Sequence, residues 1–153
     1  IFSKDTKAYR YLPDSIAAFP QGEVMKKALE FIGKDAFSYS NVKSVIIGNN
    51  VKTIGSYAFS TCSMLVSITM GSNVQNIGSF AFYDCPNLST VNSIPNTLIN
   101  IGESAFRSCS KLSSIHIPDG VISIGDYAFY GTTALANINN DKKIFFLNLS
   151  YLM

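Results

Sequence analysis

Apolar and polar positions recur along most of the chain in one fixed order, with a period of about 23 residues, which is typical of a repeat protein. Each copy contains the pair Ile-Gly, and the pair Ala-Phe follows it at a constant offset. The pair Ile-Gly stands at Ile32-Gly33, Ile54-Gly55, Ile77-Gly78, Ile101-Gly102 and Ile124-Gly125. Agreement at so many positions over five copies predicts a repeat architecture, in which each copy forms one structural unit.

A second part of each copy has the alternation of a β-strand. Between Leu65 and Met70, the residues Ile68 and Met70 share one face while Ser67 and Thr69 share the other. Glycine, asparagine and proline follow and predict a turn. We therefore expect five strands in one parallel sheet, with these β-branched residues at their centres: Val45, Ile68, Val91, Ile115 and Ile138.

The remaining part of each copy predicts the rest of a coil. Val-x-x-Ile-Gly is a second short extended segment, and its glycine permits a corner or a close approach of two backbones. We interpret the Ala-Phe segment as one helical or 3₁₀ turn with the phenylalanine pointing inward. A single coil cannot bury its own apolar side, so we expect the coils to stack, with Phe59, Phe82 and Phe106 buried on one another.

The consensus Leu-x-x-Ile-x-Ile-Pro-x-x-Val-x-x-Ile-Gly-x-x-Ala-Phe-x-x-Cys resembles the BspA-like leucine-rich repeats over residues 29–140. The segment from Ile115 to Phe129 fits almost every position. The resemblance implies an α/β, right-handed leucine-rich-repeat solenoid of about five such repeats, with short parallel strands and short helical turns. It also implies a cell-surface or secreted protein that binds or adheres to a partner, and it offers no catalytic residue to carry over.

The ends depart from the repeat pattern within what we interpret as a single domain, residues 1–153. Residues 1–31 predict a short hairpin and an N-terminal cap, residues 32–140 the repeats, and residues 141–153 a C-terminal cap. Residues 144–153 form an apolar strand candidate. The alternative is that this strand pairs end to end with a second chain.

The amino-acid composition argues against several classes of function. Charged residues make up only 14% of the chain and the net charge is +2, which gives no reason to expect a nucleic-acid partner. No apolar run reaches the roughly 20 residues of a membrane-spanning helix. His116 is the only histidine, so a histidine-based metal or triad site is not expected, and we predict no enzyme activity and no cofactor. Asp84, Glu103 and Asp126 are interpreted as solvated corner charges.

Three cysteines stand three residues after a phenylalanine: Cys62, Cys85 and Cys109. Ser40 and Thr132 occupy the same place in the first and last copies, and what these residue types share is a small side chain with one donor. We expect a buried ladder of free thiols that donate to corner carbonyl groups. Successive cysteines are a whole repeat apart, which does not fit the closely spaced cysteine pairs of structural zinc sites.

The outward face of the predicted sheet is the candidate binding surface. It carries two columns of mostly small polar side chains, and the first column comprises Ser44, Ser67, Thr90, Ser114 and Asn137. The second column comprises Ile46, Thr69, Asn92, His116 and Asn139. Solvent-facing strand residues of this kind need have no ligand. As a binding face, the columns would take a protein or a glycan on another surface. The alternative function is a structural spacer that projects another domain.

Overall fold

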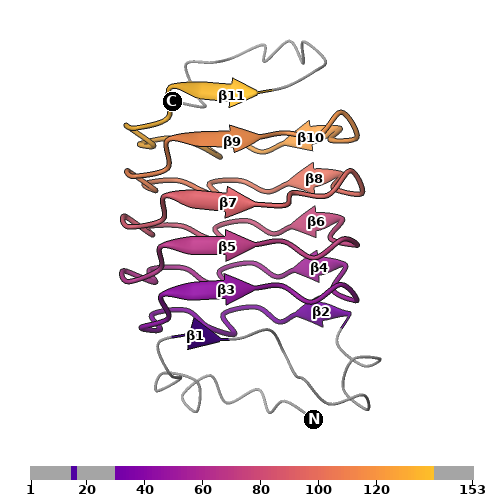
Figure 1. Ribbon diagram of the computed structural model, residues 1–153, viewed down its shortest axis with the longest axis horizontal. Helices are drawn as coiled ribbons and strands as arrows, with labels where there is room; N and C mark the ends of the chain where they lie inside the picture. Colours follow the sequence, from indigo (N-terminus) through magenta and orange to yellow (C-terminus); the bar gives the residue numbers. More distant parts are fainter. Residues whose placement is uncertain (1–14, 17–29, 140–153) are drawn as a thin grey trace.

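The computed structural model describes residues 15–16 and 30–139, and these residues form a stack of flattened coils (Figure 1). The expected hairpin and the C-terminal cap lie outside the described residues, as does most of the expected N-terminal cap. Each coil contains one longer and one shorter strand. The longer strands are β3 (Ser44–Ile46), β5 (Ser67–Thr69), β7 (Thr90–Asn92), β9 (Ser114–His116) and β11 (Asn137–Asn139). The shorter strands are β1 (Ser15–Ile16), β2 (Phe31–Ile32), β4 (Thr53–Ile54), β6 (Asn76–Ile77), β8 (Asn100–Ile101) and β10 (Ser123–Ile124).

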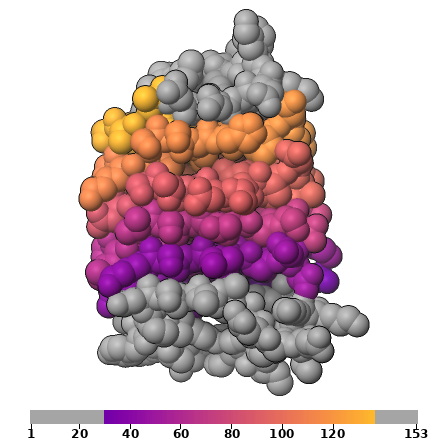
Figure 2. All heavy atoms as spheres, viewed as in Figure 1, coloured from indigo at the N-terminus to yellow at the C-terminus, as the bar shows by residue number. Residues whose placement is uncertain are grey.

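The shorter strands that follow β1 build one continuous parallel sheet in the order β10-β8-β6-β4-β2. Its five strands are separated by four full turns of the chain, so the expected solenoid of parallel strands is confirmed. Figure 2 shows the same order from outside, because the sequence colours run across the molecule in successive layers. The hand of the coil stays a prediction from the resemblance.

The longer strands divide into two sheets. One has the order β1-β3-β5-β7, with the two-residue strand β1 at its edge, and the other pairs β11 with β9. All five predicted strand centres lie in the middle of these strands, but the expectation of one five-stranded sheet is wrong. The reason is local. Val91 and Ile101 are ten residues apart, one more than the matching pair in the other copies, and Ser93 takes up the extra length with a left-handed backbone (φ 57°). The extra residue therefore lies directly after β7, next to the place where pairing with β9 is missing.

The expected helical or 3₁₀ turn at Ala-Phe is also wrong, because the described residues contain strands and turns but no helix. Successive amide groups in this segment alternate between a hydrogen bond within their own coil and a hydrogen bond to the next coil. Ala36 N donates to Gly33 O at 3.3 Å, whereas Phe37 N donates to Ala58 O at 2.7 Å. Left-handed residues flank each segment, for example Tyr57 (φ 58°) and Thr61 (φ 56°) in the second copy. A helix would keep all of these bonds to itself, so stacking of the coils takes precedence over local helical preference.

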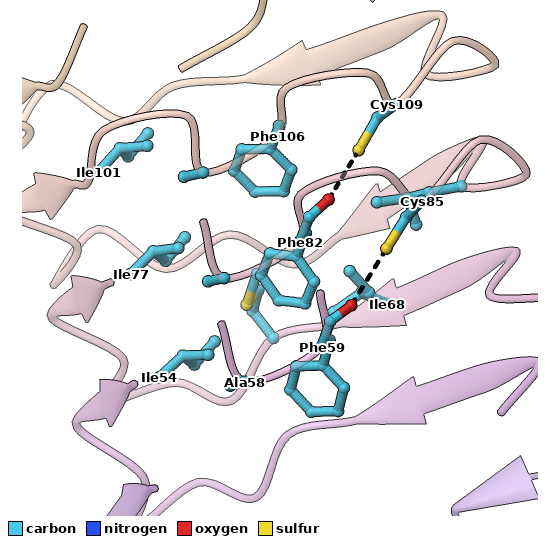
Figure 3. Close-up of a cluster of buried hydrophobic side chains, with 14 of the residues drawn as sticks. Ile54, Ala58, Phe59, Ile68, Ile77, Phe82, Cys85, Ile101, Phe106 and Cys109 are labelled. Atoms are coloured by element: carbon cyan, nitrogen blue, oxygen red, sulfur yellow. Dashed lines mark hydrogen bonds between the residues drawn. The ribbon is translucent and has the colours of Figure 1, made fainter. Parts of the chain in front are cut away.

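The phenylalanines of the Ala-Phe pairs form a column through the centre of the stack (Figure 3). Phe59, Phe82 and Phe106 are fully buried, as predicted. Ring centroids of successive phenylalanines lie 5.1 to 5.5 Å apart in stacked geometry, from Phe37 through to Phe129. One isoleucine per coil lies beside the column, so every coil adds the same apolar surface to its neighbour.

The glycine of each Ile-Gly pair allows the close approach of two coils. A Cβ atom placed on Gly102 would lie 2.4 Å from Ser79 N and 2.6 Å from the carbonyl carbon of Gly78, which is too close for any side chain. Gly33, in the first of these coils, has nothing within 4 Å of the same position. Steric space therefore explains why this position is glycine wherever a coil packs beneath it.

Candidate binding surface

The predicted polar columns come together on the outward face of the longer strands. Strand pairing aligns Ser44 with Ser67 and Thr90, and it aligns Ile46 with Thr69 and Asn92. On the other side of the break, pairing aligns Ser114 with Asn137 and His116 with Asn139. The residues of both columns are therefore in register within each sheet, but the columns are interrupted between β7 and β9.

Solvent exposure differs along these columns. Ser44, Ser67 and Thr69 are half-buried, while Ile46 is 47% exposed. The side chains that flank the break are all exposed: Thr90, Asn92, Ser114 and His116. The side chains of Asn137 and Asn139 lie outside the described part of the structure. The most accessible described part of the face is therefore the region on either side of the break between β7 and β9.

A second polar column on the shorter strands was missed by the sequence reasoning. Asn100 Nδ2 donates to Asn76 Oδ1 at 2.7 Å, and Ser123 Oγ donates to Asn100 Oδ1 at 2.9 Å. Strand pairing places these residues directly opposite one another. The available signal was a polar residue before the isoleucine in four of the five Ile-Gly pairs. Because these side chains bind one another, this column holds the coils together and offers fewer free groups to a ligand.

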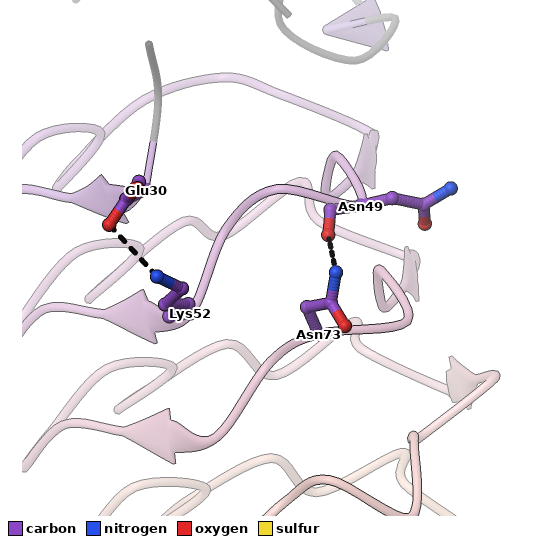
Figure 4. Close-up of polar contacts among 4 residues, drawn as sticks. All are labelled: Glu30, Asn49, Lys52 and Asn73. Carbon is purple, nitrogen blue, oxygen red and sulfur yellow. Dashed lines mark hydrogen bonds and ion pairs between the residues drawn. The ribbon is translucent and has the colours of Figure 1, made fainter. Parts of the chain in front are cut away.

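The turns between the two kinds of strand are also tied to each other (Figure 4). Asn73 Nδ2 donates to the carbonyl oxygen of Asn49 at 2.7 Å, and Ser72 N donates to Asn49 Oδ1 at 3.0 Å. Lys52 Nζ lies 3.1 Å from Glu30 Oε2 in an exposed ion pair. Contacts of this kind repeat from one coil to the next, and we interpret them as stabilising contacts of the stack.

Aromatic side chains and one arginine gather at the Ala-Phe corner of the later coils. The Arg107 guanidinium carbon lies 5.1 Å from the Tyr130 ring centroid and 5.9 Å from those of Tyr83 and Tyr127. Tyr130 is 44% exposed and Tyr127 is 36% exposed. Cation–π contacts at exposed sites contribute about 0.5–1 kcal/mol each. The sequence reasoning missed this cluster, although aromatic residues recur directly before Ala and directly after Phe.

The cysteines form the predicted ladder of buried, free thiols. Each thiol donates to the carbonyl oxygen of the phenylalanine one coil earlier, at 3.1 to 3.2 Å: Cys62 to Phe37, Cys85 to Phe59 and Cys109 to Phe82. Figure 3 shows the last two of these bonds. Burial raises the pKa of the Cys109 thiol from its ordinary value of 9.0 to about 12. The Cys109 thiol therefore stays protonated and serves as a hydrogen-bond donor.

The hydroxyl groups that replace the thiol in the first and last copies make different hydrogen bonds. Ser40 Oγ lies 3.3 Å from Cys62 Sγ, and Thr132 Oγ1 donates to Phe129 O in its own coil. No three histidine, cysteine or carboxylate groups of the described residues lie close enough together to hold a metal ion. Asp126 and Glu103 are exposed, as expected of corner charges, whereas Asp84 is half-buried.

Solved structures of two bacterial proteins resemble this fold. A leucine-rich repeat protein from Bacteroides ovatus is 35% identical with a TM-score of 0.67, over 72% of this chain and 28% of that chain. A leucine rich cell surface protein from Faecalibacterium prausnitzii is 29% identical with a TM-score of 0.58, over 69% of this chain and 34% of that chain. The chain thus spans about a third or less of either protein.

Short stretches of the chain also align with curated methyltransferases. A demethylmenaquinone methyltransferase from Bacteroides fragilis is 58% identical over 33 residues, which are 22% of this chain and 14% of that enzyme. A ubiquinone/menaquinone biosynthesis C-methyltransferase from Paraburkholderia phymatum is 38% identical over 52 residues, which are 34% of this chain and 21% of that enzyme. Overlaps this short assign no activity to the chain.

The family comparison covers far more of the molecule. The BspA type leucine-rich repeat region matches residues 30–151 in six copies, so the match extends beyond the five copies counted above. It takes in strands β2 to β11, the phenylalanine column and the cysteine ladder. No helix among the described residues is long and apolar enough to span a lipid bilayer. The chain belongs to the BspA-type leucine-rich repeat family.

Proposed function

We propose that this chain is a non-enzymatic binding module of a cell-surface or secreted protein, and that it attaches that protein to a protein or glycan on another surface. The observation that carries the proposal is the outward face of the longer strands. There, polar side chains from successive coils stand in register on a rigid backbone and point away from the core. The cell-surface relative from Faecalibacterium prausnitzii supports the location.

Rigidity is what makes such a face useful. A partner that binds a preformed array does not have to order it, so the free energy of many weak polar contacts is retained as affinity. Buried groups cannot contact a partner. The polar side chains on the shorter strands already form hydrogen bonds with one another. The longer-strand face therefore offers more free donors and acceptors than the other described sheet.

The test replaces Thr69, Asn92 and His116 together with lysine. We expect attachment of the parent protein to its target to fall sharply, because long cationic side chains cover the polar groups. The thermal unfolding midpoint should stay close to wild type, because Asn92 and His116 are exposed and Thr69 is only half-buried. Attachment is measured with whole cells or coated beads, and unfolding by circular dichroism.

A matched control variant carries the same added charge elsewhere: Ser72→Lys, Asn96→Lys and Ile122→Lys, three exposed positions near the turns. This control should attach as well as wild type. Unchanged attachment of the sheet-face variant with an unchanged unfolding midpoint would contradict the binding module. The chain would then be a structural spacer that projects another domain.

A further inference from the structure

The aromatic side chains of the Ala-Phe corner form an array that continues from one coil to the next. Rings stand directly before Ala at Tyr57, Phe80 and Tyr127, and directly after Phe at Tyr83 and Tyr130. The rings of Tyr57 and Phe80 are stacked, with centroids 4.8 Å apart. Within single coils, Phe80 meets Tyr83 and Tyr127 meets Tyr130 edge to face, at 5.7 and 5.8 Å. We call the later part of this array the corner cluster: Tyr83, Arg107, Tyr127 and Tyr130.

Arg107 takes the place of a ring in the fourth copy. The residue directly before Ala in that copy is Ser104, which is buried. The Arg107 guanidinium lies against rings of the coils before and after it, 5.9 Å from the Tyr83 centroid and 5.1 Å from that of Tyr130. Among the described residues, Arg107 forms neither an ion pair nor a side-chain hydrogen bond. Its N–H groups are therefore available to a ligand.

The corner cluster is accessible and stands on an ordered backbone. Tyr130 is 44% exposed, so ring carbon atoms face solvent as well as the hydroxyl group. The backbone beneath it is joined to the neighbouring coils, because Asp84 N donates to Arg107 O at 2.9 Å and Ser108 N donates to Tyr130 O at 2.7 Å. A ligand at this place would not have to order the chain, which lowers the cost of binding.

The charges around the corner cluster favour a ligand without net charge. Asp84 lies next to Arg107 through their backbone hydrogen bond, and Asp126 directly precedes Tyr127 in the chain. The two carboxylates repel an anion, and the guanidinium repels a cation. A hydroxyl group can donate to a carboxylate and accept from a guanidinium, so a neutral ligand with many hydroxyl groups suits both kinds of charge.

We propose that the corner cluster is a second binding site of this chain and that it binds a neutral glycan. The apolar C–H groups of a sugar ring pack against the tyrosine rings, while its hydroxyl groups bond to Arg107, Asp126 and the tyrosine hydroxyls. Tyr83 and Tyr130 are two coils apart, about 10 Å at the usual strand spacing, so the cluster contacts more than one sugar unit of a glycan chain. This site lies outside the polar columns and goes beyond the function proposed for them.

A protein partner suits the corner cluster less well than a glycan. Tyrosine and arginine are common at the centres of protein interfaces, but carboxylates are depleted there. A protein that covered the rings would also cover Asp84 and Asp126, and it would have to compensate for the lost hydration of both carboxylates. A hydrated glycan covers less of the surface and leaves these groups in contact with water or hydroxyl groups.

The ligand class is tested by affinity electrophoresis of the folded chain in gels that contain a soluble polysaccharide. The neutral probes are hydroxyethylcellulose, galactomannan and dextran. Carboxymethylcellulose and dextran sulfate carry negative charge on two of the same backbones. In buffer of physiological ionic strength, which screens the net charge of the chain, we expect a neutral polysaccharide to retard migration more than its charged counterpart. Retardation by the charged polysaccharides alone, or by none of the probes, would overturn the proposal.

The place of binding is tested with Tyr130→Ala, which removes the most exposed ring of the cluster. We expect the dissociation constant of the retarding polysaccharide to rise about tenfold or more, because an aromatic anchor is lost. The matched control is Tyr39→Ala, which removes a ring that is 65% exposed but lies outside the cluster, and it should bind as wild type does. Equal affinity of the folded Tyr130→Ala variant and wild type would overturn the proposal.

The wild-type chain supplies an independent test in case Tyr130→Ala does not fold. N-acetylimidazole acetylates accessible tyrosine hydroxyls, and mass spectrometry locates the modified residues. The retarding polysaccharide should reduce acetylation of Tyr130 and leave that of Tyr39 unchanged. Equal acetylation of Tyr130 with and without the polysaccharide would contradict the corner site.

The lysine variant of the sheet face separates this site from the proposed binding surface. It should bind the retarding polysaccharide as wild type does, whether or not it still attaches to the target. Loss of polysaccharide binding in the lysine variant, with unchanged binding in Tyr130→Ala, would place the glycan on the sheet face and overturn the corner site. Loss of attachment in Tyr130→Ala, without retardation by any neutral polysaccharide, would assign the corner cluster to a protein partner instead.

Discussion

At the scale of single residues, the phenylalanine column accounts for much of the packing between coils. Phe82 is fully buried, with Phe59 on one side and Phe106 on the other at centroid distances of 5.3 and 5.2 Å. We predict that Phe82→Ala lowers the free energy of unfolding by about 3–5 kcal/mol, because it leaves a cavity in a closely packed core. Urea unfolding measures this change. Tyr39→Ala is the control, since that ring is 65% exposed, and an equal effect of both variants would contradict the prediction.

The cysteines give a second prediction at this scale. All three thiols are fully buried, so we expect an aromatic disulfide reagent to label them slowly in the native chain and rapidly in denaturant. Fast labelling without denaturant would show that the ladder is open to solvent.

The ionisation of Cys109 adds a dependence on pH. Because its pKa rises from 9.0 to about 12 on folding, the unfolded chain loses this proton first. The stability that the protonated thiol contributes is therefore complete below pH 9 and is lost as the pH rises toward 12. Cys109→Ser should reduce this alkaline loss of stability, and an unchanged pH profile of unfolding would contradict the assignment.

At the scale of the elements, the distance between coils depends on the Ile-Gly corner. We predict that Gly102→Ala lowers the free energy of unfolding by about 3 kcal/mol, because the new methyl group meets backbone atoms that cannot rotate away. Gly33→Ala should change it by less than about 0.5 kcal/mol, because that position faces open space. Thermal or urea unfolding of the two variants measures the difference. Equal losses would mean that the glycine serves backbone freedom instead of close packing.

The elements also show what could be predicted from the sequence and why. The period-two alternation placed Ile68 and Ile115 at strand centres, because buried and exposed side chains must alternate on a strand. The Ala-Phe segment was predicted as helical because its local pattern permits a turn. Its amide groups bond to the adjacent coil instead, and this pairing between coils is not encoded in local spacing.

The candidate site was predictable in its composition but not in its continuity. Both polar columns follow from the alternation, and they lie in register as expected. The interval from Ile77 to Ile101 is the longest between successive Ile-Gly pairs, and it indicates an extra residue in this copy. That interval alone does not say which side of the coil accommodates the extra residue. The ten-residue spacing from Val91 to Ile101 places the extra residue between β7 and β8, and the left-handed backbone of Ser93 marks where the chain accommodates it.

At the scale of the whole molecule, each described coil contacts its neighbours through stacked phenylalanines and shorter-strand pairing, while the longer strands are unpaired between β7 and β9. Backbone ladders, the phenylalanine column and the thiol bonds all join neighbouring copies. In such a stack, stability is close to a sum of terms for single coils and for the interfaces between neighbours.

The phenylalanine column has a consequence for how such a gene can change. Because every junction between the described coils contains a pair of stacked phenylalanines, recombination that adds or removes one complete copy joins two surfaces that already fit in this column. Recombination within a copy displaces a phenylalanine from the column and leaves a gap in it. Arrays of this kind can therefore differ in the number of coils between related genes while each remaining coil keeps its packing. The length of the molecule can change in this way without a change in its fold.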